Sequence, residues 1–158
     1  MNPQPTGRID GNDLILTRTF RAPIEDVWTS ITDSASTARW FAKWEGEPGE
    51  GKIIRWQMTF EKGDSWTDVK IDKCDRPNQL AVTSQGKFSW SLDVRLKQSG
   101  DITTMTFVHK NVDKKMAGEI GPGWEYYLDN LIASRDGTKL PSFDDYYPSQ
   151  KEYFQKQV

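Results

Sequence analysis

The sequence predicts an α+β protein in which an antiparallel sheet of about six strands packs against one long C-terminal helix. Successive runs between residues 54 and 109 alternate apolar with polar residues, which is typical of strands with one buried and one wet face. Residues 121–135 carry the only long helical pattern. The apolar face of the sheet needs a cover, and this helix is the one predicted element that is large enough to provide it.

The chain begins with a predicted flexible segment, a strand and two short helices. Residues 1–12 are rich in Pro, Gly and Asn, whereas residues 14–20 have the β-branched and apolar composition of a strand. Pro23 is well placed to begin the first helix. Asp33 or Ser34 can cap the second helix, which carries the chain back to the sheet.

A meander of strands follows an acidic, glycine-rich connection at residues 45–51. Short turns join its runs, so neighbouring strands are predicted to pair in antiparallel fashion. In chain order the predicted elements are β-α-α-β-β-β-β-β-α. The strands of the meander are predicted at residues 54–60, 66–72, 80–83, 88–96 and 103–109.

The last helix is predicted to begin at Pro122 and to end before Gly137. Proline suits the first helical turn because its missing N–H would be unpaired there in any case. Glycine is the usual residue at a left-handed helix stop. One apolar stripe recurs at helical spacing and consists of Trp124, Tyr127, Leu128, Leu131 and Ile132.

Composition excludes several classes of protein. The formal net charge of -2 and the isoelectric point near 5.5 argue against nucleic-acid binding, which favours a basic face. One cysteine forms no intrachain disulfide and fits a reducing compartment. No apolar run approaches the roughly 20 residues that a membrane span requires, so a soluble, cytoplasmic protein is expected.

Metal binding is not expected from this residue inventory. A single histidine and a single cysteine do not supply the ligand sets of zinc sites. Asp144 and Asp145 are adjacent, but no calcium-binding loop surrounds them. We therefore expect no metal ion and no other cofactor.

The aromatic residues are the main indication of function. Seven tryptophans among 158 residues fit either a core filled by large side chains or a cavity lined by them. The cavity interpretation places the lining on the inward strand faces and the helix stripe, with Trp40 and Phe41 at an entrance. The candidate ligand-binding residues are Trp40, Phe41, Trp56, Met58, Trp90, Phe107, His109, Trp124 and Leu128.

His109 is the one candidate for catalysis. It is predicted to share the helix-facing side of its strand with Met105 and Phe107, and such apolar surroundings would lower its pKa and keep it neutral. A neutral imidazole can act as a general base or orient a polar ligand group. The simpler alternative is a histidine that is hydrogen-bonded at a strand end. The sequence places no serine or cysteine nucleophile beside it.

Short segments of the chain resemble a known superfamily. The order of elements resembles the helix-grip architecture of the START and birch-pollen-allergen (SRPBCC) superfamily. The segments together resemble the domain shared with the activator of the heat-shock protein 90 ATPase, and the match covers residues 13–147. The matching segments are Phe20 to Trp28, Arg39-Trp40-Phe41, Thr106 to His109, and Gly123-Trp124 with Leu128 and Leu131.

This resemblance implies a curved sheet that grips the last helix around an apolar cavity. Members of the superfamily bind lipids, sterols or polyketides, and some cyclise or hydrolyse what they bind. The implied function is therefore the binding of an apolar or aromatic small molecule. A cyclase or hydrolase that uses His109 is the first alternative, and a chaperone-associated interaction module is the second.

The resemblance also divides the chain into three parts. Residues 1–12 form the flexible N-terminal segment, 13–147 the domain, and 148–158 a tail. The alternatives for the tail are packing on the domain, disorder, or contact with a partner or, in a homodimer, with a second copy of the chain. The chaperone-activating members carry a separate N-terminal domain that contacts the chaperone, and residues 1–12 are too short to supply it.

Overall fold

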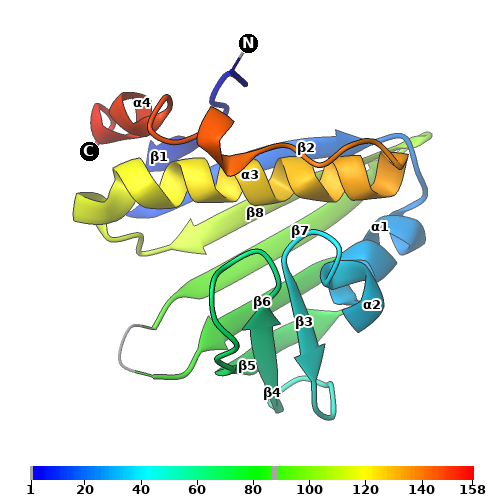
Figure 1. Cartoon of the computed structure of the whole chain (residues 1–158). Coiled ribbons are helices and arrows are strands. Elements are labelled where there is room, and N and C mark those ends of the chain that lie inside the picture. Colours follow the sequence, from blue (N-terminus) through cyan, green and yellow to red (C-terminus); the bar gives the residue numbers. More distant parts are fainter. Residues whose placement is uncertain (1, 87–88) are drawn as a thin grey trace.

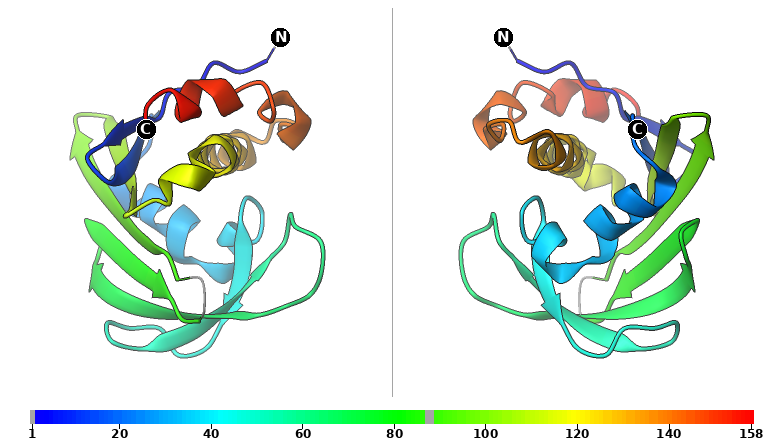
Figure 2. Two further views of the ribbon diagram at one scale, coloured as in Figure 1. Left: turned by 90° about the vertical axis from the view of Figure 1, so that its left-hand side faces the viewer. Right: turned by 90° about the vertical axis from the view of Figure 1, so that its right-hand side faces the viewer.

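One eight-stranded antiparallel sheet and a 20-residue helix across it form the body of the molecule. The computed structural model describes residues 2–86 and 89–158. The long helix, α3 (Ala117–Asp136), runs above the sheet in Figure 1. The sheet curves around α3, as both views of Figure 2 show. The predicted α+β class, the antiparallel sheet and the covering C-terminal helix are confirmed.

The strands follow the order β1-β2-β8-β7-β6-β5-β4-β3 across the sheet. The second strand, β2, therefore lies beside the last strand, β8, and β7 to β3 follow in reverse chain order. All neighbours pair in antiparallel fashion. The strands are β1 (Arg8–Asp10), β2 (Asp13–Phe20), β3 (Ala42–Glu45), β4 (Ile53–Met58), β5 (Thr67–Asp75), β6 (Gln79–Ser84), β7 (Ser91–Ser99) and β8 (Ile102–Lys110).

The sheet has two more strands than about six because two short edge strands escape a pattern search. Strand β1 has three residues, within the segment that was predicted to be flexible, and it pairs with β2. Strand β3 has four residues and pairs with β4. Runs of this length are too short to show periodicity. The boundaries of the domain at residues 13 and 147 remain a prediction.

Strand β7 begins later than predicted. The alternation suggested a strand over residues 88–96, but β7 begins at Ser91. Trp90 comes directly before it, where its backbone C=O accepts a hydrogen bond from the Ser84 N–H at 2.9 Å. Phe88 lies outside the described residues. The alternation of apolar and polar residues in the sequence thus begins before β7 does, which is why the strand was predicted to start too early.

Helix α3 begins at Ala117, so Pro122 lies inside it instead of in its first turn. A short 3₁₀ turn, η1 (Lys114–Met116), leads into it, and the Asp113 carboxylate accepts a hydrogen bond from the Lys115 N–H. The Gly-Pro-Gly run disfavours helix locally, but packing overrides this preference. Gly137 ends the helix in the left-handed conformation, with φ 69°, as predicted.

Two short helices close one end of the space between α3 and the sheet. Helix α1 (Ile24–Thr32) buries Val27, Trp28 and Ile31. Helix α2 (Ser34–Thr37) follows, and the Asp33 side chain accepts a hydrogen bond from the Ser36 N–H at 3.1 Å. Capping by Asp33 is thereby confirmed. Both helices lie beneath the C-terminal end of α3 in Figure 1.

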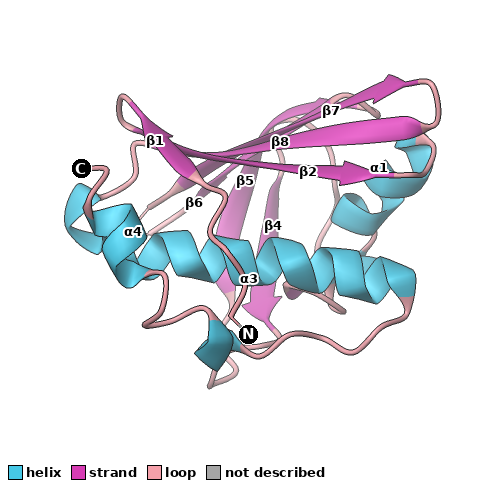
Figure 3. Cartoon of the chain, turned by 90° about the horizontal axis from the view of Figure 1, so that it is seen from above, coloured by secondary structure: helices cyan, strands magenta, loops and turns pink. Residues whose placement is uncertain are grey.

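The C-terminal segment packs back onto α3. It contains the 3₁₀ turn η2 (Phe143–Asp145) and helix α4 (Lys151–Gln155). Tyr146 and Phe154 are fully buried. Figure 3 shows α4 beside the N-terminal half of α3, and Figure 2 shows that it lies near β1, on the side of α3 opposite β4 and β5.

Within the described ranges, no helix has the length and the apolar character to cross a membrane.

Candidate functional site

A cavity of about 520 Å³ lies between α3 and the inward face of the sheet. Its walls are mostly apolar and come from both layers and from the two short helices. The lining residues are Trp28, Thr29, Ile31, Thr32, Asp33, Thr37, Trp40, Phe41, Ala42, Trp44, Pro48, Gly49, Ile54, Trp56, Ile71, Cys74, Arg76, Leu80, Val82, Leu92, Val94, Met105, Phe107, Trp124 and Leu128.

The floor of the cavity follows directly from strand alternation. Side chains two residues apart on a strand point to the same face. The register places Val82 opposite Leu92 and Val94 opposite Phe107, so inward residues of β6, β7 and β8 form one continuous apolar surface. On α3, Trp124 and Leu128 are four residues apart and therefore lie on the same side of the helix.

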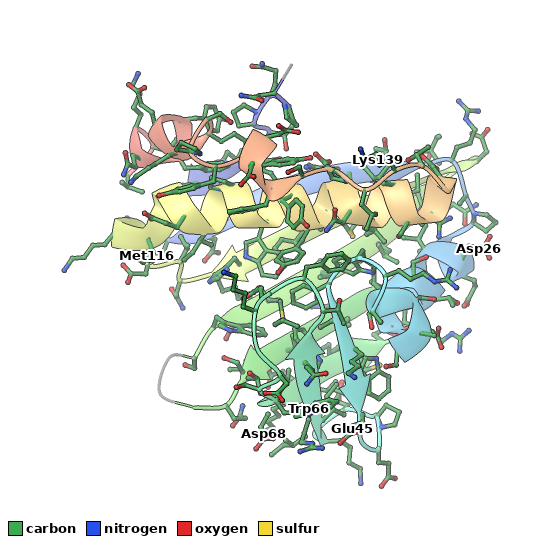
Figure 4. The ribbon with its side chains drawn as sticks, viewed as in Figure 1. Asp26, Glu45, Trp66, Asp68, Met116 and Lys139 are labelled. Carbon is green, nitrogen blue, oxygen red and sulfur yellow. The ribbon has the colours of Figure 1, made fainter. Side chains whose placement is uncertain are left out.

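Phe41 is the centre of an aromatic wall. Its ring meets Trp56 edge-on at 5.0 Å between centroids and Tyr127 edge-on at 5.1 Å. It also stacks with Trp40 at 5.4 Å and lies 5.5 Å from Trp124. Such offset and edge-to-face pairs stabilise one another and fix the ring orientations. Figure 4 shows the aromatic side chains that gather between α3 and the sheet.

Not every tryptophan belongs to this wall. Trp66 is labelled at the far end of the sheet from α3 in Figure 4. There the Arg55 guanidinium lies 4.7 Å from its ring centre, and the Lys43 ammonium lies 5.6 Å from it. Trp66 thus packs under charged side chains on the outside of the sheet.

The structure brings most of the predicted ligand-binding residues to the cavity. Those that line it are Trp40, Phe41, Trp56, Phe107, Trp124 and Leu128. Met58, Trp90 and His109 are near the wall but are not part of the lining. The ring of Trp90 lies 5.4 Å from that of Trp56 and so supports the wall from behind. A ligand-binding role for any of these residues remains a prediction.

Trp40 and Phe41 lie in the interior and not at an entrance. Their side chains are 7% and 6% exposed. Trp40 donates its indole N–H to the Ser30 carbonyl at 2.9 Å, which holds the ring against α1. The resemblance matched Arg39-Trp40-Phe41 to the end of the second helix, but the chain turns inward there before β3.

The exposed residues of the lining mark where the cavity opens to solvent. They are Thr29, Asp33, Pro48, Cys74 and Arg76. Arg76, in the turn between β5 and β6, donates from Nε and Nη2 to Glu25 Oε2 on α1, at 3.1 and 2.9 Å. This ion pair joins the sheet to α1 beside the opening. Sequence reasoning missed it because the two residues are far apart in the chain.

His109 is neutral in this structure and is held by Trp124. The indole N–H of Trp124 donates to Nδ1 of His109 at 3.0 Å, so Nδ1 carries no proton. Burial lowers the pKa of His109, and the negative charge of Asp13 opposes part of that effect. Within the described residues this is the only hydrogen bond of the imidazole, so no acid or base is hydrogen-bonded to it.

A second hydrogen bond to α3 comes from the loop between β4 and β5. The hydroxyl of Tyr127 donates to Oε2 of Glu61, which lies in the loop between β4 and β5. Burial, followed by the hydrogen bond to Glu61, raises the pKa of Tyr127. The tyrosine is therefore a neutral donor that fixes this loop against the helix.

Sequence reasoning also missed a buried ion-pair network between β2 and α3. Arg18 donates to Glu125 Oε1 at 2.8 Å and to Asp129 Oδ1 at 3.1 Å. Glu125 also accepts hydrogen bonds from the backbone N–H groups of Thr6 and Gly7. One signal was available: Arg18 occupies an inward position of a strand that is otherwise apolar on that face. The network lies outside the cavity and fixes α3 to the sheet.

Acidic and metal-binding side chains do not gather at the cavity. Among residues 2–86 and 89–158, no group of three His, Cys, Asp or Glu side chains lies close enough to hold a metal ion. What the cavity offers chemically is an apolar and aromatic surface with a few polar groups at its opening. This arrangement fits the enclosure of an apolar molecule.

Comparison with known proteins gives a family and a shared fold. The sequence model of the family "Activator of Hsp90 ATPase homolog 1-like protein" matches residues 21–134. No curated protein matches the sequence of the chain.

Several solved structures have the same fold. CalU16 from Micromonospora echinospora has a TM-score of 0.75 and 24% sequence identity, and the match covers 98% of this chain and 95% of CalU16. A Bordetella parapertussis protein has a TM-score of 0.80 and 20% identity, with 100% of this chain and 95% of that one covered. DynU16, from the dynemicin biosynthetic locus, has a TM-score of 0.71 and 18% identity over 85% of this chain and 51% of DynU16.

Proposed function

Because the chain belongs to the family of activator of Hsp90 ATPase homolog 1-like proteins, we propose that it binds an apolar or aromatic small molecule between the sheet and α3. The observation that carries this proposal is the cavity itself. Its volume of about 520 Å³ falls in the range of small-molecule sites, roughly 300–1,000 Å³. The ligand class is lipid-like or polyketide-like.

The aromatic wall supports a ligand with a flat or unsaturated body. Phe41, Trp56 and Trp124 present ring faces and edges whose orientations are fixed by mutual contact. Aromatic pairs gain about 0.5–1.5 kcal/mol beyond the burial of their surface, so an aromatic ligand gains more here than an aliphatic one of equal area. The place of DynU16 in a biosynthetic locus also supports a small molecule as the ligand class.

The catalytic alternative receives less support from the geometry. A cyclase or hydrolase that uses His109 needs the imidazole within reach of the bound molecule and an acid or base to complete the proton transfer. His109 is not part of the cavity lining, and Trp124 occupies its Nδ1. The chaperone-associated alternative has no observation in its favour beyond the name of the family.

A fluorescence titration with a neutral aromatic probe tests the proposal. We expect 1-naphthaleneacetamide to quench tryptophan emission saturably, with one site per chain. Val82→Phe places extra volume on the cavity floor and should weaken binding. Val108→Phe, on the outward side of β8, is the matched control and should bind like the wild type. Absence of saturable binding, or equal binding by both variants, would contradict the proposal.

A further inference from the structure

The opening of the cavity carries a single basic side chain. Among the described residues that line the cavity, Arg76 is the only Lys, Arg or His, and Asp33 is the only acidic residue. The remaining polar lining residues are threonines and the one cysteine. An otherwise apolar pocket with one cation at its mouth matches a molecule with an apolar body and one anionic end.

The present partner of Arg76 is poorly suited to hold it. Nε and Nη2 both donate to the same oxygen of Glu25, whereas a guanidinium fork is best matched by both oxygens of one carboxylate. The two side chains are 67% and 54% exposed, and pairs of this kind contribute little stability in water. Within the described residues, Nη1 of Arg76 makes no hydrogen bond.

Glu25 can leave Arg76 without becoming an isolated charge. It lies in the first turn of α1, where the N-terminal end of the helix dipole favours negative charge. Its side chain is also well exposed, so water can hydrate the released carboxylate.

Asp33, the other charge at the opening, is already engaged. Its Oδ2 accepts hydrogen bonds from the N–H and the hydroxyl of Ser36, at 3.1 and 3.0 Å. This carboxylate therefore caps α2, and its charge is directed toward that helix. Arg76 is therefore the charged group at the opening that can pair with an anion.

From these contacts we infer that the ligand is an organic acid whose carboxylate replaces Glu25 on Arg76 while its apolar body fills the cavity. The inference rests on the proposed function and adds the chemical class of the ligand. Glu25 then acts as a counter-ion that holds Arg76 in place until a ligand arrives.

Two isosteric probes test this inference separately from the proposed function. 1-Naphthaleneacetic acid is ionised at neutral pH, and 1-naphthaleneacetamide has nearly the same shape without the charge. We expect the acid to bind about tenfold tighter, as is typical of a charge-assisted hydrogen bond. Arg76→Gln should abolish this preference, so that the variant binds the acid and the amide with similar affinity.

Two further variants sharpen the test. Glu25→Gln removes the competitor and should strengthen binding of the acid by about two- to fivefold. Arg21→Gln is the matched control, because Arg21 is also exposed and paired, with Asp101 at 2.9 Å, but it does not line the cavity. It should bind both probes as the wild type does.

The outcomes are distinguishable. If the amide binds and the acid binds no better, or if Arg76→Gln keeps the preference, the role of Arg76 is wrong and the cavity remains a binding site. If neither probe binds, the proposed function fails and the inference fails with it.

Discussion

The indole N–H of Trp124 donates to Nδ1 of His109 at 3.0 Å, which joins α3 to β8 beside the cavity. Trp124 was predicted to lie on the apolar stripe of the last helix, and His109 on the helix-facing side of the last strand. The hydrogen bond fixes the ring of Trp124 against Phe107, 4.5 Å away between centroids. It also determines the protonation of the histidine, because Nδ1 accepts only when it is unprotonated.

Removal of this donor should destabilise the fold. Trp124→Phe leaves the buried Nδ1 of His109 without a partner, and an unsatisfied buried polar group costs about 1–3 kcal/mol. Loss of ring area adds to this effect. Urea denaturation at pH 7.5 measures the change in the free energy of unfolding. A change below about 0.5 kcal/mol, the usual effect of a surface substitution, would show that the hydrogen bond is unimportant.

The pH dependence of stability should carry the signature of a buried neutral histidine. Burial holds the folded-state pKa of His109 below the ordinary histidine value of 6.5. Above pH 6.5 the residue is neutral in both states and contributes no pH dependence. As the pH falls through 6.5, the unfolded chain takes up a proton and the folded chain does not, so stability is lost until the lower folded-state pKa is reached.

The measurement compares unfolding free energies at pH 7.5 and pH 5.5. His109→Asn should flatten the dependence over this window, because His109 is the only histidine in the chain. The variant should be less stable than the wild type at pH 7.5. The informative quantity is therefore the change in the free energy of unfolding between pH 7.5 and pH 5.5, measured for each protein. An unchanged slope in the variant would exclude His109 as its source.

The buried ion-pair network should be far more sensitive than exposed ion pairs. Arg18→Met leaves Glu125, which is 1% exposed, without its charge partner, and such a loss costs about 3–5 kcal/mol. The double variant Arg18→Met/Glu125→Gln should recover part of the loss. Arg8→Met breaks an exposed pair with Asp10 and serves as the control, with no measurable change expected. Equal effects at Arg18 and Arg8 would contradict this account.

Two glycines of α3 should respond to alanine with opposite signs. A Cβ on Gly121 would lie 2.4 Å from Cγ of Phe154, so Gly121→Ala should destabilise by about 1–3 kcal/mol through overpacking. A Cβ on Gly123 meets nothing within 4 Å, so Gly123→Ala should stabilise by about 0.5–1 kcal/mol through helix propensity. Thermal unfolding of both variants gives the comparison, and stabilisation by both would contradict the close packing of α4 on α3.

The same glycines explain why the start of α3 was misplaced. Local preference argued for a break at the Gly-Pro-Gly run, and the packing of Phe154 against Gly121 is invisible before the chain is folded. The C-terminal end was predicted correctly because Gly137 acts through its own backbone conformation, which is a local property. Local sequence signals therefore predict a helix end that is set by local backbone conformation, but not a helix start that is set by packing.

The cavity floor was predictable for a similar reason. Alternation within the predicted strands 88–96 and 103–109 puts Leu92, Val94 and Phe107 at inward positions, and the register of β7 and β8 joins them into one face. His109 is on the same inward face of β8 as Phe107, yet it is not part of the cavity lining. Alternation predicts which face of a strand a residue is on, but not where along that face the cavity ends. The pair between Arg76 and Glu25 depends on how α1 sits against the sheet, which no pattern in the sequence specifies.

Alkylation of Cys74 tests the central claim most directly. This side chain is the only cysteine, it is exposed, and it lines the opening of the cavity. Its rate of reaction with iodoacetamide should fall severalfold when 1-naphthaleneacetamide is added to saturation, because the bound molecule restricts access to the thiol. The Val82→Phe variant should show a smaller effect at the same probe concentration. A saturably bound probe that leaves the alkylation rate of the wild-type protein unchanged would contradict binding in this cavity.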